Sequence, residues 1–303
     1  MNLSLLILKS YATLLRLLTP NSGLTRLSFN RPVNRLFGAV SKVLPTVTAE
    51  GVKIDVDVTD YHGRILWLFG SNDFKVSRTV NALLEPTRIL LDIGANYSTI
   101  GLSAAHAMGG KGRVHLFEPQ PGLAAVVRRA IAGAGLDSQV TLHEVALFDS
   151  DGTMELSVPS HHSGMSSLVR SAPEGTSVMV AVKSTRAYLE PLVQGQSFGV
   201  KIDIEGAEPS VLPGLFEMGT MRFCVFEGAN HQQVLLDLFR GADFEIFGLC
   251  RTIFSVRVQH VSTIEEFRKF HDFVAIKASG TPPAGPVSLR RLKDYMETTS
   301  RGS

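Results

Sequence analysis

Four acidic residues, Asp92, Glu118, Asp203 and Glu227, stand at or just after the ends of apolar segments that are typical of buried strands. In an open parallel sheet, ligands bind beside the carboxyl ends of the strands. Acids at successive strand ends would therefore face one ligand from one edge of the sheet. Because like charges repel, this edge suits a positive amino group, a ribose and a hydroxyl acceptor better than a phosphate.

The turn from Asp92 to Asn96 is the candidate cofactor loop. It is not a G-x-G-x-x-G fingerprint, because Ala95, Asn96 and Ser98 stand where that pattern needs glycines, and the chain has no G-K-[ST] phosphate loop. Taken alone, the turn is as consistent with a plain strand-to-helix connection as with a binding loop. Glu118 follows about one strand–helix–strand unit later, where an acid can accept hydrogen bonds from both hydroxyls of a ribose.

The segment from Lys201 to Glu208 carries further acids. Strand alternation puts Asp203 and Glu205 on the same side, where they could bind a divalent cation such as Mg²⁺ or serve as a base. The alternative is that Glu205 and Glu208 only favour the N-terminus of the next helix. Glu227 adds an acid on the same edge. Three histidines stand in nearby loops, where a histidine is more often solvated than catalytic: His161, His162 and His231.

The elements that must position these residues alternate regularly. Strands are expected at 88–93, 113–117, 140–146, 198–204, 221–226, 244–247, 253–258 and 273–277, and helices at 99–108, 121–134, 208–217 and 231–239. This order predicts an α/β fold with a parallel sheet and helices on both faces. A hairpin of residues 153–158 and 178–182, around a polar loop at 161–167, interrupts it. A second hairpin, of residues 52–58 and 65–69, is expected ahead of the sheet.

Composition limits the class of protein. Of the 303 residues, 44% are apolar and 19% charged, and the net charge is +2, which is typical of a globular protein and gives no case for nucleic acid. The two cysteines, Cys224 and Cys250, form no disulfide framework, so a reducing, cytoplasmic setting is predicted. The sequence divides into an N-terminal extension (1–49), a main domain (50–278) and a Pro- and Gly-rich tail (279–303) that is expected to be disordered.

The N-terminal extension is basic and apolar. Residues 1–49 carry six Lys or Arg and no acid. The stretch from Leu3 to Leu18 is very apolar, but Lys9 and Arg16 interrupt it and it is too short to span a bilayer comfortably. Two interpretations stay open: a helix packed on the main domain or on a second subunit of a homo-oligomer, or an arm that lies on the anionic inner face of a membrane.

The chain resembles the FkbM family of class I S-adenosylmethionine-dependent methyltransferases over roughly residues 51–277. The matching segments are LLDIGANYSTIGLSAA from Leu90, VHLFEPQP from Val114, VALFDSDG from Val145, SGMSSL from Ser163, VKIDIEGAEPSVLPGL from Val200 and, more weakly, VFEGANH from Val225. The resemblance implies a Rossmann-like, doubly wound sheet of seven strands with an antiparallel final strand, preceded here by a helical and hairpin extension.

The resemblance also implies roles for particular residues. Those that would hold the methionine end of the cofactor are Asp92, Gly94 and Asn96. Glu118 would hold the ribose, and Ala146 and Asp149 would lie near the adenine. Ser166 and Asp203 would face the methyl group or the acceptor, with Asp203 or Glu227 directed at the acceptor oxygen or at a bound cation. A carboxylate touching the sulfur would stabilise the ground state more than the transition state.

The implied activity is O-methylation, by in-line transfer, of a hydroxyl on a sugar, a glycolipid or another secondary-metabolite acceptor. The expected partner is therefore a small molecule, a glycan or a lipid-linked acceptor. The family usually has glycine at the position of Ser98, Ser or Thr at that of Gly101 and aspartate at that of Arg186. These departures support an alternative, an inactive module that keeps the fold and binds the cofactor. A third reading, a nucleotide-sugar or NAD enzyme, is disfavoured by the missing glycine fingerprint.

Overall fold

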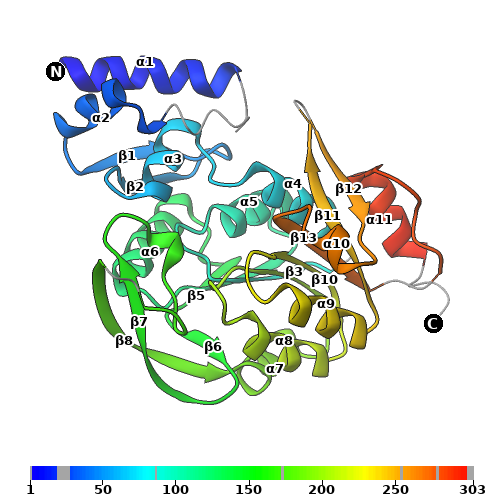
Figure 1. Cartoon of the computed structure of the whole chain (residues 1–303). Coiled ribbons are helices and arrows are strands. Elements are labelled where there is room, and N and C mark those ends of the chain that lie inside the picture. The colour runs from blue at the N-terminus through cyan, green and yellow to red at the C-terminus, as the bar shows by residue number, and fades with distance from the viewer. Residues whose placement is uncertain are drawn as a thin grey trace.

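The computed structural model describes residues 2–18, 28–85, 87–171, 174–252, 255–277 and 280–298. Within these ranges, nine strands form the main sheet, in the order β14-β12-β11-β13-β10-β9-β3-β4-β5 (Figure 1). Its parallel strands are β3 (Ile89–Ile93), β4 (Arg113–Phe117), β5 (Val140–His143), β9 (Phe198–Ile202) and β10 (Met221–Glu227). The strand β13 (Asp272–Lys277) pairs antiparallel with both β10 and β11 (Phe244–Arg251), so β13 is the reversed strand and β11 runs in the direction of β10. At the edge, β12 (Val256–His260) pairs antiparallel with β11, and β14 (Val287–Ser288) pairs antiparallel with β12.

Helices cover both faces of this sheet because successive strand residues point to opposite sides. Leu90 packs into one core and its neighbour Leu91 into the other. The first core is covered by α4 (Phe74–Leu83), α5 (Thr99–Met108) and α6 (Pro121–Ala134). The second is covered by α7 (Thr185–Val193), α8 (Glu208–Glu217) and α9 (Gln232–Gly241). The predicted doubly wound α/β fold is confirmed.

Two strands exceed the seven that the resemblance implied. The strands β5-β4-β3-β9-β10-β13-β11 account for the expected sheet, and β12 and β14 extend its edge beyond β11. In the chain, the short helix α10 (Ile264–Phe267) lies between β12 and β13, and α11 (Leu289–Thr298) follows β14. The expectation of a disordered tail is wrong for the described part of residues 279–303. Leu292 and Met296 of α11 are fully buried, so this amphipathic segment gains enough apolar contact to fold on the sheet.

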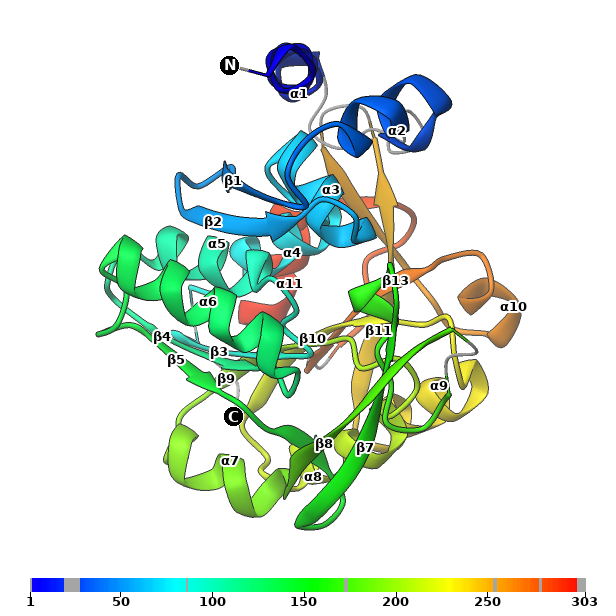
Figure 2. The same cartoon turned by 90° about the vertical axis from the view of Figure 1, so that its left-hand side faces the viewer.

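The predicted hairpin between the third and fourth parallel strands is confirmed. It consists of β7 (Gly152–Pro159) and β8 (Gly175–Ser184), and a short strand, β6 (Ala146–Phe148), joins β8 to make a small three-stranded sheet among the described residues (Figure 2). The expected strand 140–146 is therefore two strands, β5 and β6, in different sheets. Between β7 and β8, the 3-10 helix η2 (Ser163–Met165) lies in the polar loop.

The hairpin ahead of the main sheet was predicted with the wrong second strand. Lys53–Asp57 (β2) pairs with Val43–Val47 (β1), and Tyr61–Phe69 is a helix, α3. An apolar run such as 65–69 does not separate a strand from a buried helix by periodicity alone. The capping residues identify this segment as a helix: at its start Asp60 accepts a hydrogen bond from the Gly63 N–H at 2.9 Å, and at its end Gly70 has φ +77°. The division at residue 49 therefore cuts a hairpin.

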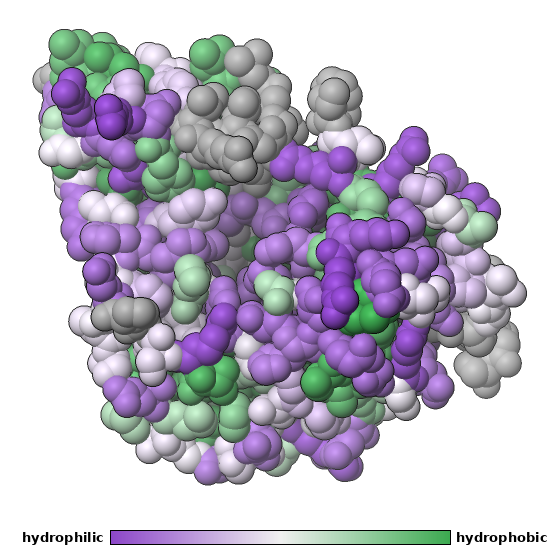
Figure 3. All heavy atoms as spheres, viewed as in Figure 1, coloured by the Kyte–Doolittle hydropathy of each residue, from purple (hydrophilic) through white to green (hydrophobic). Residues whose placement is uncertain are grey.

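The helices α1 (Leu3–Leu18) and α2 (Arg31–Gly38) complete this N-terminal module, in which α1 packs against α2 and α3 at the outer end of the molecule (Figure 1). Apolar side chains lie along the free margin of α1 (Figure 3). In the parts of the chain that the structure describes, no helix has both the length and the apolar character needed to cross a bilayer.

Candidate active site

A cavity of about 710 Å³ lies at the carboxyl ends of β3, β4, β9 and β10. The chain turns from β3 outward to β5 and then crosses to β9, so the cavity sits at the point where the strand order reverses. The polar loop with η2 and the first residues of α3 close it from the other side. The predicted site residues in its lining are Gly94, Asn96, Glu118, Ala146, Ser166, Asp203 and Glu227.

Backbone geometry brings the turn after β3 close to the end of β9. Gly94 has φ +75°, and a side chain there would overlap the backbone oxygen of Asp203, so only glycine fits. Asn96 also has a left-handed backbone, at φ +51°, and its N–H donates to Oε2 of Glu118 at 2.7 Å. The N–H groups of Gly94 and Ala95 both donate to the Phe117 carbonyl, so the turn is held rigidly by its own hydrogen bonds and lines the cavity as a wall beside the start of α5.

Asp92 does not reach the cavity, contrary to the role that the resemblance implied. Its side chain is fully buried, with Oδ2 accepting from the Gly101 N–H at 3.0 Å and Oδ1 lying 3.4 Å from Nζ of Lys201. A Cβ at Gly101 would overlap Leu116, which explains why this chain keeps glycine there. Asp92 thus fixes the start of α5 beneath the turn and lies outside the cavity lining.

Glu118 has the surroundings expected of a ribose-binding acid. It is 6% exposed, lines the cavity, and accepts backbone hydrogen bonds from Asn96 and, at 2.9 Å, from Gln120. Burial raises its pKa to about 7, although these two backbone donors act in the opposite direction. Each carboxylate oxygen can accept more than one hydrogen bond, so both can also receive a ribose hydroxyl.

The side of the cavity next to Glu118 is apolar, as a planar base requires. Phe117, Pro119, Ala146 and Leu147 line it. Asp149, predicted to lie near an adenine, is exposed and outside the lining. The reason is that β6 leaves the main sheet to pair with β8, which carries the residues that follow it towards solvent.

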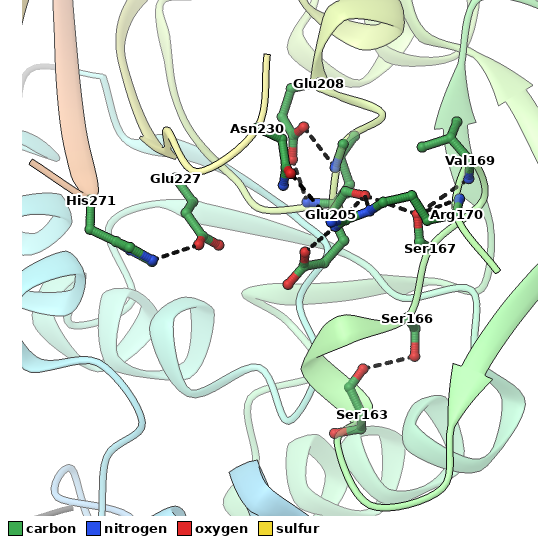
Figure 4. A network of polar contacts seen from close by, with 12 residues as sticks. Ser163, Ser166, Ser167, Val169, Arg170, Glu205, Glu208, Glu227, Asn230 and His271 are labelled. Carbon is green, nitrogen blue, oxygen red and sulfur yellow. Dashed lines mark hydrogen bonds and ion pairs between the residues drawn. The ribbon is translucent and has the colours of Figure 1, made fainter. Parts of the chain in front are cut away.

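Three carboxylates converge at the opposite end of the cavity. Oxygen atoms of Asp203, Glu205 and Glu227 lie within 4.8 Å of one another. Arg170 forms an ion pair with Glu205, and Nε2 of His271 lies 3.0 Å from Oε1 of Glu227 (Figure 4). Burial raises the pKa of Glu227 to about 8, and the charge of Asp203 acts in the same direction. A carboxyl with this pKa is a much stronger base than an ordinary glutamate.

The partners of Glu227 come from a strand that sequence reasoning did not connect to the site. In the antiparallel register of β10 and β13, Glu227 stands opposite Asp272. Oδ1 of Asp272 lies 3.3 Å from Nδ1 of His271 and its other oxygen pairs with Lys75. The hydrogen bond with Asp272 raises the pKa of His271 to about 9, so the imidazole is charged at neutral pH. In the sequence, His271 and Asp272 are visible only as two adjacent polar residues just before the predicted strand 273–277.

The polar loop is held over the cavity by the N-terminal module. Asp60 accepts hydrogen bonds from the N–H of Ser163 at 2.6 Å and from its hydroxyl at 3.0 Å. His162 lines the cavity and stacks on Tyr61 at 4.6 Å. Ser166 also lines it, with its hydroxyl donating to the Ser163 carbonyl at 2.8 Å (Figure 4). Neither His161 nor His231 is in the lining.

Two departures from the family pattern lie outside the cavity. Ser98 has φ +55°, a left-handed conformation that glycine adopts without strain, and its buried hydroxyl has no hydrogen-bond partner among the described residues. Arg186 lies on the surface, where it pairs with Glu190 and Glu217 at 3.6 and 3.3 Å. Neither side chain lines the cavity.

The sequence matches the methyltransferase FkbM domain over residues 92–297, more than half of the 303-residue chain. The chain therefore belongs to the family of methyltransferases with this domain. A comparison with curated proteins gave no match.

Three solved structures illustrate the similarity. A precorrin-6Y C5,15-methyltransferase from Geobacter metallireducens is 10% identical, with 67% of this chain and 87% of that chain covered and a TM-score of 0.39. An S-adenosylmethionine-dependent O-methyltransferase from Thermotoga maritima is 12% identical, with 83% of each chain covered and a TM-score of 0.38. An O-methyltransferase from Bacillus cereus in complex with S-adenosylhomocysteine is 12% identical, with 66% and 77% covered and a TM-score of 0.35. Similarity this low says nothing about the acceptor.

Proposed function

We propose that this protein methylates a hydroxyl group on a sugar, a glycolipid or another secondary-metabolite acceptor, with S-adenosylmethionine as the methyl donor. The observation that carries the proposal is Glu227, a carboxyl with a raised pKa that faces the end of the cavity farthest from the apolar base slot. An alcohol gives up its proton about as reluctantly as water, with a pKa of about 16, so its methylation benefits from a base.

The cavity fits the cofactor in three places. Glu118 offers carboxylate oxygens for the ribose, the apolar slot beside Ala146 takes the adenine, and the turn from Gly94 to Asn96 forms the wall against which the methionine end lies. When bound, the cofactor supplies an electrophilic methyl group on a sulfonium. The chain holds the acceptor oxygen in line with that methyl group, and such positioning supplies roughly 7–11 kcal/mol of the barrier.

In this proposal Glu227 removes the hydroxyl proton. His271, fixed by Asp272, donates to Glu227 and orients its carboxyl towards the cavity. Asp203 supports the acceptor from the end of β9, where its side chain is 40% exposed. Polar groups at this end, among them Asn230 and Arg170, suit an acceptor rich in hydroxyls.

The same carboxylates could in principle hold a divalent cation, but two of them already face a positive group. Arg170 is paired with Glu205, and His271 is charged beside Glu227. A cation would have to displace or approach these charges, which costs electrostatic energy. We therefore expect chelation by EDTA to change turnover by less than about twofold. Loss of turnover that Mg²⁺ restores would assign these acids to a cation instead.

The rival function, a module that binds the cofactor without transfer, rested on Ser98 and Arg186. Both lie outside the cavity lining, so neither supports inactivity.

The direct test is a transfer assay with methyl-labelled cofactor over a panel of free sugars, glycans and glycolipids, beside a calorimetric titration with the cofactor. The proposal expects cofactor binding and label on a hydroxyl of at least one acceptor, with Glu227→Gln as the inactive control. Absence of cofactor binding overturns it. Label that appears only on nitrogen or carbon atoms overturns the assignment to hydroxyls.

A further inference from the structure

The helix α1 has two apolar faces on opposite sides. Its inner face packs in the first core, where Leu8, Ala12 and Leu15 are at most 6% exposed. At 100° per residue, a second stripe of large apolar side chains lies on the far side of the helix. Its members and their exposed fractions are Leu3 (69%), Leu6 (44%), Ile7 (45%), Leu14 (51%) and Leu17 (78%). We call these five residues the outer face.

The side chains of the outer face are between 44% and 78% exposed, and Figure 1 shows α1 at the margin of the molecule. Scattered exposed leucines need no explanation, but five large apolar side chains on one side of a single helix, interrupted only by the small Ser10, indicate a binding surface. Elsewhere in the described chain, the large exposed apolar side chains are spread over several elements.

The charges around the outer face indicate which kind of partner it binds. Residues 1–49 contain no Asp or Glu. Lys9 is exposed on the flank of α1, and α2, which lies beside it, exposes Arg31 and Arg35 (Figure 2). Two copies of this module placed face to face would bring like charges together. An anionic bilayer instead complements both features, because it accepts apolar side chains and attracts Lys and Arg.

We propose that the outer face of α1 docks this protein on an anionic phospholipid membrane. The helix has 16 residues and lies in the plane of the interface, with the outer face at the boundary of headgroups and acyl chains. The module is a rigid support, since Arg16 donates to the carbonyl oxygens of Val47 at 3.0 Å and Trp67 at 2.8 Å. Docking does not depend on the proposed methyl transfer.

Docking would also orient the cavity. The helix α3, on which α1 packs, supplies Tyr61 and His62 to the cavity wall. A membrane-bound α1 therefore holds the acceptor side of the cavity at a fixed distance from the lipid surface. If the proposed function holds, this arrangement favours a lipid-linked acceptor over a free sugar.

The test is flotation of the full chain with vesicles of phosphatidylcholine containing about one-third phosphatidylserine, and with vesicles of phosphatidylcholine alone. Deleting α1 would remove buried residues of the core, so substitutions on the outer face are used instead. The variant is Leu14→Ser/Leu17→Ser. Its matched control is Met179→Ser/Val234→Ser, which removes side chains of similar exposure (63% and 46%) from β8 and α9. Circular dichroism and thermal unfolding show whether each variant is folded.

The proposal expects wild type and the matched control to float with the anionic vesicles and less with neutral ones. The Leu14→Ser/Leu17→Ser variant should bind at least about tenfold more weakly. A second variant, Lys9→Glu/Arg35→Glu, should lose the preference for anionic lipid while keeping the fold. Equal binding by wild type and the outer-face variant overturns the proposal, as does no wild-type binding. A lipid-free dimer that the outer-face substitutions dissociate assigns this face to a second copy and also overturns it.

Discussion

Two neighbouring parallel strands, β3 and β9, each carry an aspartate followed by isoleucine near the carboxyl end, yet the two acids have different surroundings. Asp92 is buried and its side chain is 0% exposed, whereas the side chain of Asp203 is 40% exposed in the cavity. The register explains this: Asp92 pairs with Lys201, two residues before Asp203. Asp92 thus lies inside its strand and Asp203 just beyond the end of its own. Position relative to the strand end decides whether an acid is buried in the sheet or faces the cavity.

Lys201 links the two acids. Its Nζ lies 3.4 Å from Asp92, 3.9 Å from Asp203 and 2.7 Å from the carbonyl oxygen of Gly94. Burial lowers the pKa of Lys201, but Asp92 and Asp203 more than offset this, so the lysine stays charged. One buried cation balances one buried acid, which leaves a net negative charge at the acid that faces the cavity.

The largest expected effect is on turnover. Asp203→Asn should lower kcat by about 10²-fold, the scale of the loss when an acceptor is misplaced by about 1 Å, while cofactor affinity stays nearly intact. Labelled transfer measures kcat, and calorimetric titration measures affinity. The free energy of unfolding should change by less than about 1 kcal/mol, because the side chain is partly exposed. Turnover at the wild-type level would remove Asp203 from the site.

The matched change on β3 should act on stability. Asp92→Asn removes one partner of a buried ion pair and should lower the free energy of unfolding by about 3–5 kcal/mol. Urea unfolding followed by fluorescence of Trp67 and the other aromatic residues measures the loss. If the Asp92→Asn protein were as stable as wild type but had no turnover, Asp92 would act in the reaction rather than in the fold, and the proposed difference between Asp92 and Asp203 would be wrong.

A third acid, Glu227, tests whether the exposed end of the sheet performs proton transfer. Glu227 must lose its proton to act as a base, and its pKa is raised to about 8. The value of kcat should therefore rise about tenfold per pH unit up to about pH 8 and then level off. The charge of His271 lowers the pKa of Glu227, so His271→Gln should move this rise to higher pH. An unshifted profile would mean that His271 only supports the fold.

Local signals in the sequence were enough for the regular elements. Helices 99–108 and 121–134 have the bounds that were predicted, because Gly109 and Gly135 end them in left-handed conformations. The run at 65–69 was misassigned, since its burial on all sides comes from α1 and the β1–β2 hairpin, which periodicity does not reveal. The fold of the tail depends on contacts of Leu292 and Met296 with a distant strand edge.

The candidate site was predictable only in part for the same reason. Acids at strand ends could be listed from the sequence, and most of them line the cavity. The burial of Asp92 depends on its pairing with Lys201, more than 100 residues later. The contact of Glu227 with His271 depends on an antiparallel register between β10 and β13. Register and sheet order are long-range properties, and no local pattern encodes them.

The smallest expected effect concerns strain in the turn after β3. Ser98 has a left-handed backbone and a fully buried hydroxyl that finds no hydrogen-bond partner in the described part of the chain. Glycine removes both penalties but adds chain entropy to the unfolded state, so Ser98→Gly should raise the free energy of unfolding by about 1 kcal/mol. Ser98→Ala is the matched control, because it removes the hydroxyl and keeps the strain. If the gain comes from relief of backbone strain, Ser98→Gly should have a higher urea midpoint of unfolding than Ser98→Ala. Since Ser98 does not line the cavity, a change of kcat in Ser98→Gly would show that the rigidity of this turn serves catalysis as well as the fold.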